Sequence, residues 1–295
     1  MDDWELEPLP FSGHGQWVRT ALHCHTRESD GGLSPTDTVN RYADLGYHCI
    51  AITDHRKVTP IGHLSTESMS TFDGIEVGGQ PDVIGIAVDR APDPSLSFCT
   101  KVKMLAEQGA FTIGAHPSYS GAMPETYLEC PAIDAIEIYN AYCDEAYANG
   151  LSTELWDMLL RSGMRVWGVA SDDAHLNPEK RYFSDAGHAW IEVWADELKH
   201  PSILDALRKG SFYSTQGPRF ISFNSGESSF EFSCTPVHQV RWRSWGSSGF
   251  VQYCGGEPIT RSQVPDGFSP KDYLRVELVD SEGRRAWSNP FFLLS

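Results

Sequence analysis

Short apolar runs alternate with longer mixed segments along the first 218 residues of the chain. Runs rich in Val, Ile, Phe and Trp and bounded by polar or Gly-containing segments are typical of buried strands. The runs that predict strands are Val18–Leu22, Cys49–Thr53, Ile75–Val77, Val83–Ala87, Phe111–Ala115, Ala135–Tyr139, Val166–Ala170, Trp190–Trp194 and Phe212–Ser214. Their alternation with helix-like segments is typical of a parallel sheet built from strand–helix units.

Several of the intervening segments carry signals for helices. Ser34 is an N-cap residue, Pro35 suits the first helical position, and Asp37 places an acidic side chain in the first turn. Further helices are predicted from about Ser95 to Gly109, across Leu151–Ser162 and over Pro201–Lys209. So many units favour a (β/α) barrel, one that can stop short of eight strands.

The periodicity changes after Gly217-Pro218, which marks the predicted domain boundary. Beyond it, apolar residues alternate with polar ones, a pattern typical of strands with one buried face. The alternating apolar positions are Phe230, Phe232 and Cys234, then Leu274, Val276 and Leu278, before a last strand that ends in Phe291-Phe292-Leu293-Leu294. We predict two domains, an α/β barrel over residues 1–218 and a small antiparallel β-sandwich over residues 219–295. Trp242 and Trp245 are expected to be exposed, where they would suit packing on the barrel or a dimer contact.

Composition and charge narrow the classes of function. The chain has 295 residues, 40% of them hydrophobic and 21% charged, which is enough to bury a sizeable core. The net charge is −17, and because acidic and basic residues balance from Arg219 onward, the negative charge lies in residues 1–218. Such a field repels phosphate backbones, so it argues against a general nucleic-acid binder and suits a protein that binds cations.

The cellular location is predicted from the N-terminus, the apolar runs and the cysteines. Acidic residues precede any apolar run at the N-terminus, and no apolar run is long enough to span a membrane. The seven cysteines form no CxxC pair, so reduced thiols are expected rather than a disulfide framework. We therefore expect a cytoplasmic protein without a membrane contact.

His, Asp and Glu residues gather where the predicted strands end. His23 and His25 follow the first strand, His55 follows the second, and His116 follows Phe111–Ala115. In a barrel of parallel strands all carboxyl ends open on one face, so these side chains converge on one pocket. Side chains two apart in an extended segment point the same way, so His23 and His25 can reach one ion. A single histidine is more often a structural polar group, but imidazole and carboxylate ligands together suit Zn²⁺, Mn²⁺ or Fe²⁺.

Ordered motifs along residues 18–218 resemble those of the PHP (polymerase and histidinol phosphatase) superfamily. They are His23-Cys24-His25-Thr26 with Ser29-Asp30-Gly31, then Ile52-Thr53-Asp54-His55, Gly74-Ile75-Glu76, Ala115-His116-Pro117 and Ser171-Asp172-Asp173-Ala174-His175. Within that superfamily, Ser34-Pro35, Gly210-Ser211-Phe212-Tyr213 and Gly217-Pro218 resemble the carbaryl-hydrolase-type branch. The resemblance implies a distorted, TIM-like (β/α)7 barrel with two or three divalent ions, zinc, manganese or iron, at the carboxyl ends of its strands.

The resemblance also implies a set of metal ligands. They are His23, His25, Asp30, His55, Glu76, His116, Asp172, Asp173 and His175. Asp173 and His175 match the usual Asp-x-His pattern, whereas Asp172 matches the usual Ser-Asp pattern, so either or both of the two carboxylates are candidates. Asp82 stands where many relatives have a His, and a carboxylate can also bind a hard ion.

The expected reaction is hydrolysis of a small phosphoester by a metal-bridging hydroxide. Its catalytic candidates are His175, Asp30 and Arg27, with His175 or a metal-free Asp protonating the leaving group. Weaker substrate-contact candidates are Asn140, Arg56, Arg181 and Asp82. For Asn140 the alternative is a helix N-cap, and for each Arg it is a solvated side chain.

Two other functions stay open at this point. The same metal site could hydrolyse a carboxylic ester or a carbamate, which the branch resemblance would permit. A non-catalytic binding or scaffold module is the rival from another class, although nearly every motif position carries a residue able to bind metal. An exonuclease role ranks lower because no basic track is visible. The expected partner is therefore a small phosphorylated substrate rather than a nucleic acid or a membrane, with a homo-oligomer left open.

Overall fold

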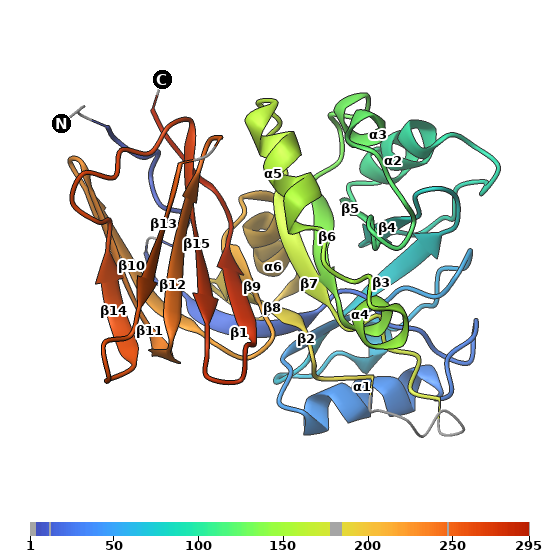
Figure 1. Ribbon diagram of the computed structural model, residues 1–295. Coiled ribbons are helices and arrows are strands. Elements are labelled where there is room, and N and C mark those ends of the chain that lie inside the picture. The colour runs from blue at the N-terminus through green and yellow to red at the C-terminus, as the bar shows by residue number, and fades with distance from the viewer. Residues whose placement is uncertain (1–3, 12, 178–184, 247, 295) are drawn as a thin grey trace.

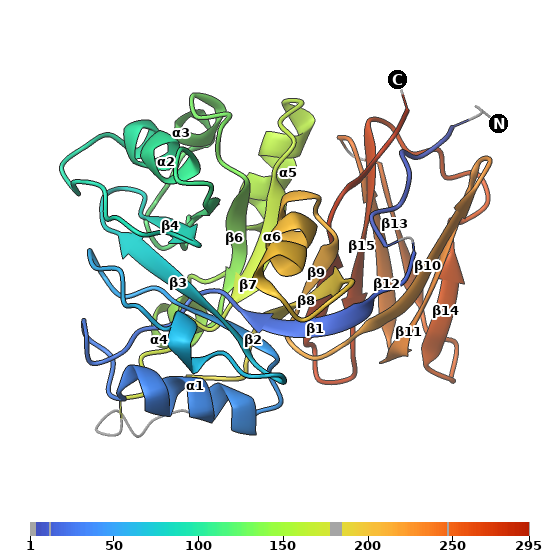
Figure 2. The same cartoon turned by 180° about the vertical axis from the view of Figure 1, so that it is seen from behind.

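The computed structural model describes residues 4–11, 13–177, 185–246 and 248–294 of this mixed α/β protein (Figures 1 and 2). A 14-stranded sheet contains the strand order β13-β12-β15-β16-β9-β8-β1-β2-β3-β4-β5-β6-β7, with β17 paired to β15. A separate three-stranded sheet has the order β10-β11-β14. The mixed α/β class is as predicted, but the C-terminal strands are divided between the two sheets.

The first nine strands form the part of the large sheet that precedes residue 218. They are β1 (Gln16–Ala21), β2 (Cys49–Ile52), β3 (Ser70–Val77), β4 (Val83–Ile86), β5 (Phe111–Gly114), β6 (Ala135–Asn140), β7 (Trp167–Ser171), β8 (Trp190–Ala195) and β9 (Phe212–Thr215). Each coincides with a predicted apolar run, and β3 begins earlier than predicted.

Six α-helices and one 3-10 turn lie among these strands in the described residues. They are α1 (Pro35–Asp44), η1 (Gly62–Leu64), α2 (Phe98–Ala106), α3 (Pro124–Leu128), α4 (Ala141–Tyr147), α5 (Thr153–Arg161) and α6 (His200–Arg208). The predicted cap of α1 is confirmed, because the Ser34 side chain accepts a hydrogen bond from the backbone N–H of Asp37. The short helices α3 and α4 were not predicted. Among the described residues, no helix is both long and apolar enough to cross a membrane.

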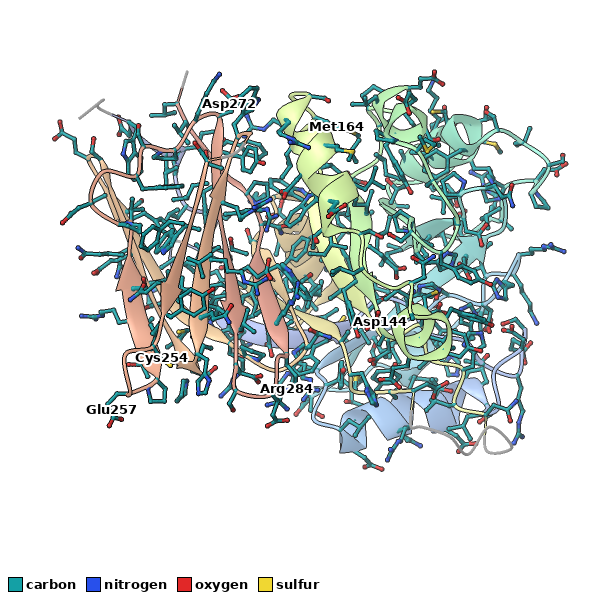
Figure 3. All side chains as sticks on the ribbon, in the orientation of Figure 1. Asp144, Met164, Cys254, Glu257, Asp272 and Arg284 are labelled. Atoms are coloured by element: carbon teal, nitrogen blue, oxygen red, sulfur yellow. The ribbon has the colours of Figure 1, made fainter. Side chains whose placement is uncertain are left out.

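Strand direction departs from the uniformly parallel prediction. β1, β2 and β3 are mutually parallel, as are β5, β6 and β7, but β4 pairs antiparallel with both β3 and β5. β8 is antiparallel to β1. The six strands β1, β2, β3, β5, β6 and β7 therefore all point the same way, and their carboxyl ends lie on one side. Asp144 of α4 lies near that side in Figure 3, whereas Met164, just after α5, lies at the opposite end.

The large sheet curls so that its last strand, β7, approaches β9. Hydrogen bonds from side chains join the two strands: the hydroxyl of Ser214 donates to the carbonyl of Gly168 at 2.8 Å. Asn289 accepts from the N–H of Gly168 at 2.9 Å and donates to the carbonyl of Phe212 at 3.0 Å. At the carboxyl side, Cys24 and Ala174 form a parallel bridge, so the segments after β1 and β7 lie side by side.

The C-terminal strands enclose a second core. They are β10 (Phe220–Gly226), β11 (Ser229–Val237), β12 (Gln239–Ser244), β13 (Gly249–Tyr253), β14 (Ile259–Gln263), β15 (Tyr273–Val279), β16 (Arg285–Ser288) and β17 (Phe291–Phe292). Apolar side chains of β10 and β11 share one buried cluster with those of β12 and β15. The alternation predicted at Phe230, Phe232 and Cys234 corresponds to residues of this core.

The prediction for Trp242 was wrong. Its side chain has 0% exposure and packs against Phe232, with ring centroids 5.5 Å apart, because it lies on the inward face of β12. Trp245 is exposed, as predicted. Strand β16 pairs with β9, so the large sheet runs continuously across the predicted boundary at Gly217-Pro218.

Candidate metal centre

The six parallel strands deliver the predicted residues to one place. His23 and His25 follow β1, His55 follows β2, Glu76 lies within β3, and His116 follows β5. Asp173 and His175 follow β7. Three groups of these side chains have ligand atoms close enough together to hold a metal ion, namely His25, Asp30, His55 and His175, then His23, His25 and Asp173, and finally Glu76, Asp82 and His116.

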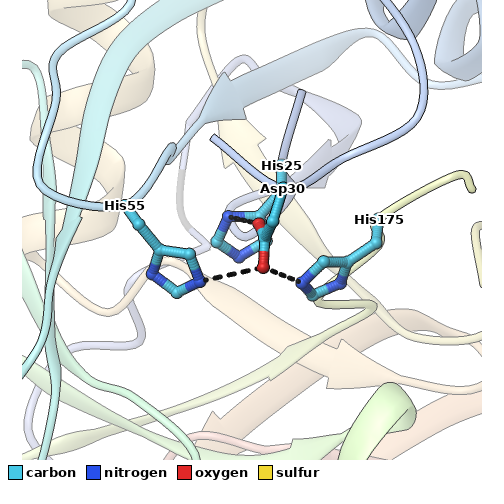
Figure 4. Close-up of side chains that lie close together, drawn as sticks. All are labelled: His25, Asp30, His55 and His175. Carbon is cyan, nitrogen blue, oxygen red and sulfur yellow. Dashed lines mark ion pairs between the residues drawn. The ribbon is translucent and has the colours of Figure 1, made fainter. Parts of the chain in front are cut away.

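The first group surrounds the carboxylate of Asp30 (Figure 4). Asp30 Oδ2 lies 3.6 Å from His55 Nε2 and 3.4 Å from His175 Nε2, and Oδ1 lies 3.7 Å from His25 Nδ1. The side chain of Asp30 is 54% exposed, whereas that of His25 is buried. This group therefore forms the side of the centre nearest to solvent.

The second group is fully enclosed. Nε2 of His23 and Nε2 of His25 lie 3.2 Å apart, and each faces Asp173 Oδ1, at 3.2 and 3.1 Å. This confirms that the two histidines point the same way, as their spacing predicted, while Cys24 is buried among apolar residues. Two imidazole nitrogens and a carboxylate oxygen are ligands typical of zinc and other transition metals.

Glu76 lies close to histidines of all three groups. Its Oε1 lies 2.9 Å from His116 Nε2, and its Oε2 lies 3.0 Å from His55 Nδ1 and 3.4 Å from the Nε2 atoms of both His23 and His25. Oε2 is nevertheless buried without a hydrogen-bond partner, and so is Nδ1 of His25. Buried polar atoms are normally satisfied, so an unpaired oxygen facing several imidazoles fits a carboxylate that binds cations.

The carboxylates and histidines of the centre shift one another's pKa values. The carboxylates of Asp30 and Glu76, both close to the imidazole, raise the pKa of His55 to about 10. Burial opposes protonation of His116, but hydrogen bonding to Glu76 and the charge of that carboxylate raise its pKa to about 9. Hydrogen bonds from His175 and His55 hold the pKa of Asp30 well below its usual range. The arrangement thus attracts positive charge, which divalent ions would supply in place of protons.

Glu137 is a buried carboxylate beside the candidate ligands that was not predicted from the sequence. Its buried carboxylate in β6 accepts from His23 Nδ1 at 2.8 Å and from the N–H of His116 at 2.7 Å, and it also accepts from the hydroxyl of Ser171. A carboxylate on the far nitrogen of a metal-binding histidine fixes the tautomer and orientation of the ring. The signal for it was a single charged residue within the apolar strand Ala135–Asn140.

Asn140 is a helix N-cap, the alternative to a substrate contact, and it also holds carboxylates of the centre. Its side-chain oxygen accepts from the N–H of Cys143 at 2.9 Å and so caps α4. Its amide nitrogen donates to Glu137 at 2.9 Å and to Asp173 Oδ2 at 3.1 Å. Asn140 therefore positions two carboxylates of the centre rather than standing free to contact a substrate.

Asp172 lies outside the cluster, which corrects its prediction as a metal ligand. Both of its oxygens are used: Oδ2 accepts from the hydroxyl of Tyr42 at 3.0 Å and from the N–H of Gly187 at 2.8 Å, and Oδ1 accepts from the N–H groups of His188 and Ala189, each at 2.8 Å. The next residue, Asp173, has a left-handed backbone with φ of 54° and faces the centre. Asp172 and Asp173 thus point to opposite sides of the segment that ends the strand.

The remaining predicted residues occupy different surroundings. Asp82 precedes β4, and because β4 runs antiparallel its amino end lies beside the carboxyl ends of β3 and β5; Asp82 Oδ2 is 3.9 Å from His116 Nε2. Arg56 lines a cavity of about 580 Å³ together with Asp30, His55 and Asp82. Arg27 is exposed and its Nε donates to the carbonyl of Gly32, within its own loop. Arg181 lies outside the described residues.

Three tyrosines flank the centre between two of its histidines. Tyr119 lies against His116, with ring centroids 5.5 Å apart, and Tyr142 lies 4.8 Å from His175. Tyr147 lies between the two tyrosines, 5.0 Å from Tyr119 and 6.1 Å from Tyr142. The rings of Tyr119 and Tyr147 are substantially exposed, so an aromatic surface borders the centre.

Comparisons with known proteins bear on the fold. No protein-family profile matches the chain. A curated 5'-3' exoribonuclease of Haemophilus influenzae is 25% identical over 185 residues, which cover 59% of this chain and 60% of that protein. The chain thus spans less than two thirds of the curated relative that it matches.

Among solved structures, a two-domain protein from Bacteroides vulgatus that contains a predicted PHP-like metal-dependent phosphoesterase aligns with 94% of each chain, with a TM-score of 0.56 and 17% identity. An amidohydrolase from Chromobacterium violaceum aligns with 54% of this chain and 88% of its own, with a TM-score of 0.40 and 16% identity, which is too low to support an argument. The chain therefore has the fold of a protein with a PHP-like metal-dependent phosphoesterase part.

Proposed function

We propose that the protein is a PHP-type hydrolase that uses two or three divalent metal ions to cleave a small phosphoester. The observation that carries this proposal is the convergence of three ligand groups on Glu76, whose Oε2 is buried, unpaired and surrounded by histidine nitrogens. The fold supports it, because the structure aligned over most of both chains contains a PHP-like metal-dependent phosphoesterase.

The ligands would be His23, His25, Asp30, His55, Glu76, Asp82, His116, Asp173 and His175. Divalent ions bound there would lower the pKa of water and neutralise charge on phosphoryl oxygens. Nδ1 of His175 lies 2.9 Å from the carbonyl of Asp173, so a proton on Nδ1 would leave the Nε2 lone pair facing the centre. Glu137 would hold His23 in the matching orientation, with Nε2 toward the cluster.

Substrate contacts are proposed from the cavity over the first ligand group. Arg56 contributes a guanidinium to this cavity, where it could bind a phosphoryl oxygen with paired N–H donors. Asp30 is the most exposed carboxylate of the centre, but its lowered pKa makes it a poor proton donor to the leaving group. Arg27, a catalytic candidate from the sequence, donates from Nε to the carbonyl of Gly32. It could reach a substrate only if its loop moved and this hydrogen bond broke.

The test is elemental analysis of protein purified without chelator, followed by assays with a p-nitrophenyl phosphate. We expect two or three bound equivalents of zinc, manganese or iron and hydrolysis that a chelator abolishes. His23→Ala should lose metal and turnover, whereas His63→Ala, at an exposed position outside the three groups, should lose neither. Unchanged metal content and turnover in His23→Ala would show that the assignment is wrong.

Hydrolysis of a carboxylic ester or carbamate is the nearest competing proposal. It would use the same ligands and differ only in the atom attacked, so the centre itself does not choose between them. A matched panel of a p-nitrophenyl phosphate and a p-nitrophenyl ester distinguishes the two. A higher kcat/KM for the carboxylic ester would reverse the order of the proposals.

Removal of residues from the 5' end of RNA is a second candidate function. It is favoured by the 25% identity to a 5'-3' exoribonuclease and by the exposed rings of Tyr119 and Tyr147, because unpaired bases stack on aromatic side chains. The net charge of −17 opposes it. A short 5'-phosphorylated RNA oligonucleotide, compared with a phosphomonoester of similar size to one nucleotide, would show which substrate has the higher kcat/KM.

Three further proposals concern the whole protein. We place a domain boundary near Gly217-Pro218, with residues 219–295 as a supporting β-rich unit rather than an independent binding module. We also propose a cytoplasmic enzyme with a small phosphorylated substrate, and a homo-oligomer as an arrangement to be tested by light scattering.

A further inference from the structure

A second polar pocket lies away from the three ligand groups, between helix α5 and the strands β12, β15 and β16. Its volume is about 800 Å³. Four arginines line it, all carried by these strands: Arg241, Arg243, Arg275 and Arg285. Figure 1 shows α5 beside β15, where the first part of the chain meets the C-terminal strands.

The register of the strands forces these arginines together. Arg243 of β12 pairs directly with Arg275 of β15, and Arg241 pairs with Glu277. Like charges directly opposite each other on paired strands destabilise a sheet, so the arrangement needs compensation by anions. The neighbouring apolar residues of β12 and β15 point to the other side, into the core shared with β10 and β11.

Two buried carboxylates serve the four guanidinium groups. Asp157 of α5 accepts from Nε and Nη2 of Arg275, at 2.9 and 2.6 Å, and from Nη2 of Arg243 at 2.7 Å. Oε1 of Glu277 lies 2.9 Å from Nη1 of Arg241 and 3.2 Å from Nη1 of Arg285. The four guanidinium groups therefore face two buried carboxylates, which leaves two positive charges without a buried counter-charge.

One buried nitrogen of Arg275 lacks a hydrogen-bond partner. The side chain of Arg275 is only 1% exposed, and its Nη1 has no hydrogen-bond partner. A buried charged donor without a partner is costly, and a water molecule or an anion normally satisfies it. The only other acidic residues lining the pocket, Glu125 and Glu154, are exposed and lie on the opposite wall.

We propose that this pocket is a binding site for a phosphate-type oxyanion, either inorganic phosphate or the phosphoryl group of a small metabolite. Planar guanidinium groups bind such tetrahedral oxyanions through paired N–H donors, and four of them here face one cavity in a protein of net charge −17. The site is independent of the proposed hydrolysis. The opposite wall includes Ser118, two residues after His116, so the pocket adjoins the segment that follows one ligand of the centre.

The test is isothermal titration of the chelator-treated full chain with two probes. Inorganic phosphate represents the free ion and methylphosphonate represents a phosphoryl group that cannot be hydrolysed. We expect saturable binding of at least one probe at one site, at constant ionic strength maintained with chloride. The probe with the lower Kd identifies the source of the ligand. No heat from either probe would overturn the proposal.

Variants assign the bound anion to the pocket. The double variant Arg241→Gln/Arg285→Gln removes two charged donors, and we expect its Kd to rise by about tenfold or more. Arg241→Lys/Arg285→Lys keeps the charge and should bind with intermediate affinity, which separates lost donors from misfolding. His116→Ala, in the metal centre, should bind the probe as the unmodified chain does. Binding that survives the Gln variant but is lost in His116→Ala would place the anion in the metal centre and refute the proposal.

Discussion

At the scale of single residues, the centre depends on side chains that hold its ligands as much as on the ligands themselves. Glu137 contacts His23 Nδ1 and the backbone N–H of His116, and Asn140 joins Glu137 to Asp173. These contacts fix two histidines and one carboxylate before any ion binds. Because the fold already orients these ligands, we expect metal affinity to depend also on residues that do not contact the metal.

Glu137→Gln tests this dependence. The change keeps the size of the side chain but removes the charge and places an amide donor among N–H groups that now donate to the carboxylate. We expect metal affinity to fall by roughly 10- to 100-fold, as is usual when such an orienting partner is lost. Competition with a chelating dye measures it. The matched control is Glu192→Gln, another buried carboxylate, which accepts from the indole of Trp190 in β8 and should leave metal affinity unchanged.

The neighbouring carboxylates Asp172 and Asp173 should behave differently when neutralised. Asp172→Asn would set an amide N–H against backbone N–H groups of residues 187–189, so we expect a loss of about 1–3 kcal/mol in the free energy of unfolding with unchanged metal stoichiometry. Asp173→Asn should instead lower metal content. Urea unfolding and elemental analysis of both variants provide the comparison. Metal loss in Asp172→Asn alone would reverse the assignment.

The sequence identified most of the residues that converge, but not the direction of each side chain. Histidines after strand ends were recognisable because parallel strands bring such positions together. Asp172 is bound instead by a loop that returns at residues 187–189. That contact does not follow from local patterning, because the loop lies further along the chain.

At the scale of elements, strand direction decides which residues reach the centre. All nine strands before residue 218 were predicted, yet β4 turned out to be antiparallel to its neighbours. A strand has the same apolar pattern in either direction, so periodicity cannot reveal this. The reversal has a chemical consequence, because it places Asp82, at the amino end of β4, beside His116.

Asp82→Asn should affect one ligand group more than the others. Asp82 belongs with Glu76 and His116, whereas Asp30, His55 and His175 form a separate group. We expect the variant to bind about one metal equivalent fewer than the unmodified chain, because an amide oxygen is a weaker ligand than a carboxylate. Elemental analysis after dialysis against buffer without metal measures the stoichiometry. Equal metal content in the two proteins would mean that Asp82 is not a ligand.

The C-terminal elements were less predictable for a physical reason. β11 buries alternate side chains and β15 is buried throughout, and apolar residues alternate along the sequence of both, whereas β13 is largely exposed and buries no face that such a pattern could signal. Its pairing partner, β12, places Trp242 in the core. Trp242 was expected to be exposed, but on this strand it is the flanking arginines that point away from the core.

At the scale of the whole molecule, the two predicted domains share a sheet and an interface. β16 pairs with β9, and Trp287 of β16 packs against Tyr139 of β6, with ring centroids 5.9 Å apart. Asp157 of α5 binds the buried Arg275 of β15. The bridge between Leu6 and Leu293 adds the N-terminal segment to the C-terminal strands. Sequence patterns predicted a boundary near Gly217-Pro218 but could not show that contacts cross this position so extensively.

A chain that ends at Gly217 tests whether the first part folds alone. Its loss of β16 would leave β9 as an open sheet edge and would expose Tyr139, which Trp287 now covers. Asp157 would lose its ion pairs with Arg243 and Arg275. We therefore expect the shortened chain to aggregate or to elute as an expanded species, because unpaired edges and exposed apolar surface promote association. Size-exclusion chromatography and circular dichroism of both chains measure this. A soluble, compact and metal-binding product would show instead that the shared sheet is dispensable and that residues 1–217 are an autonomous domain.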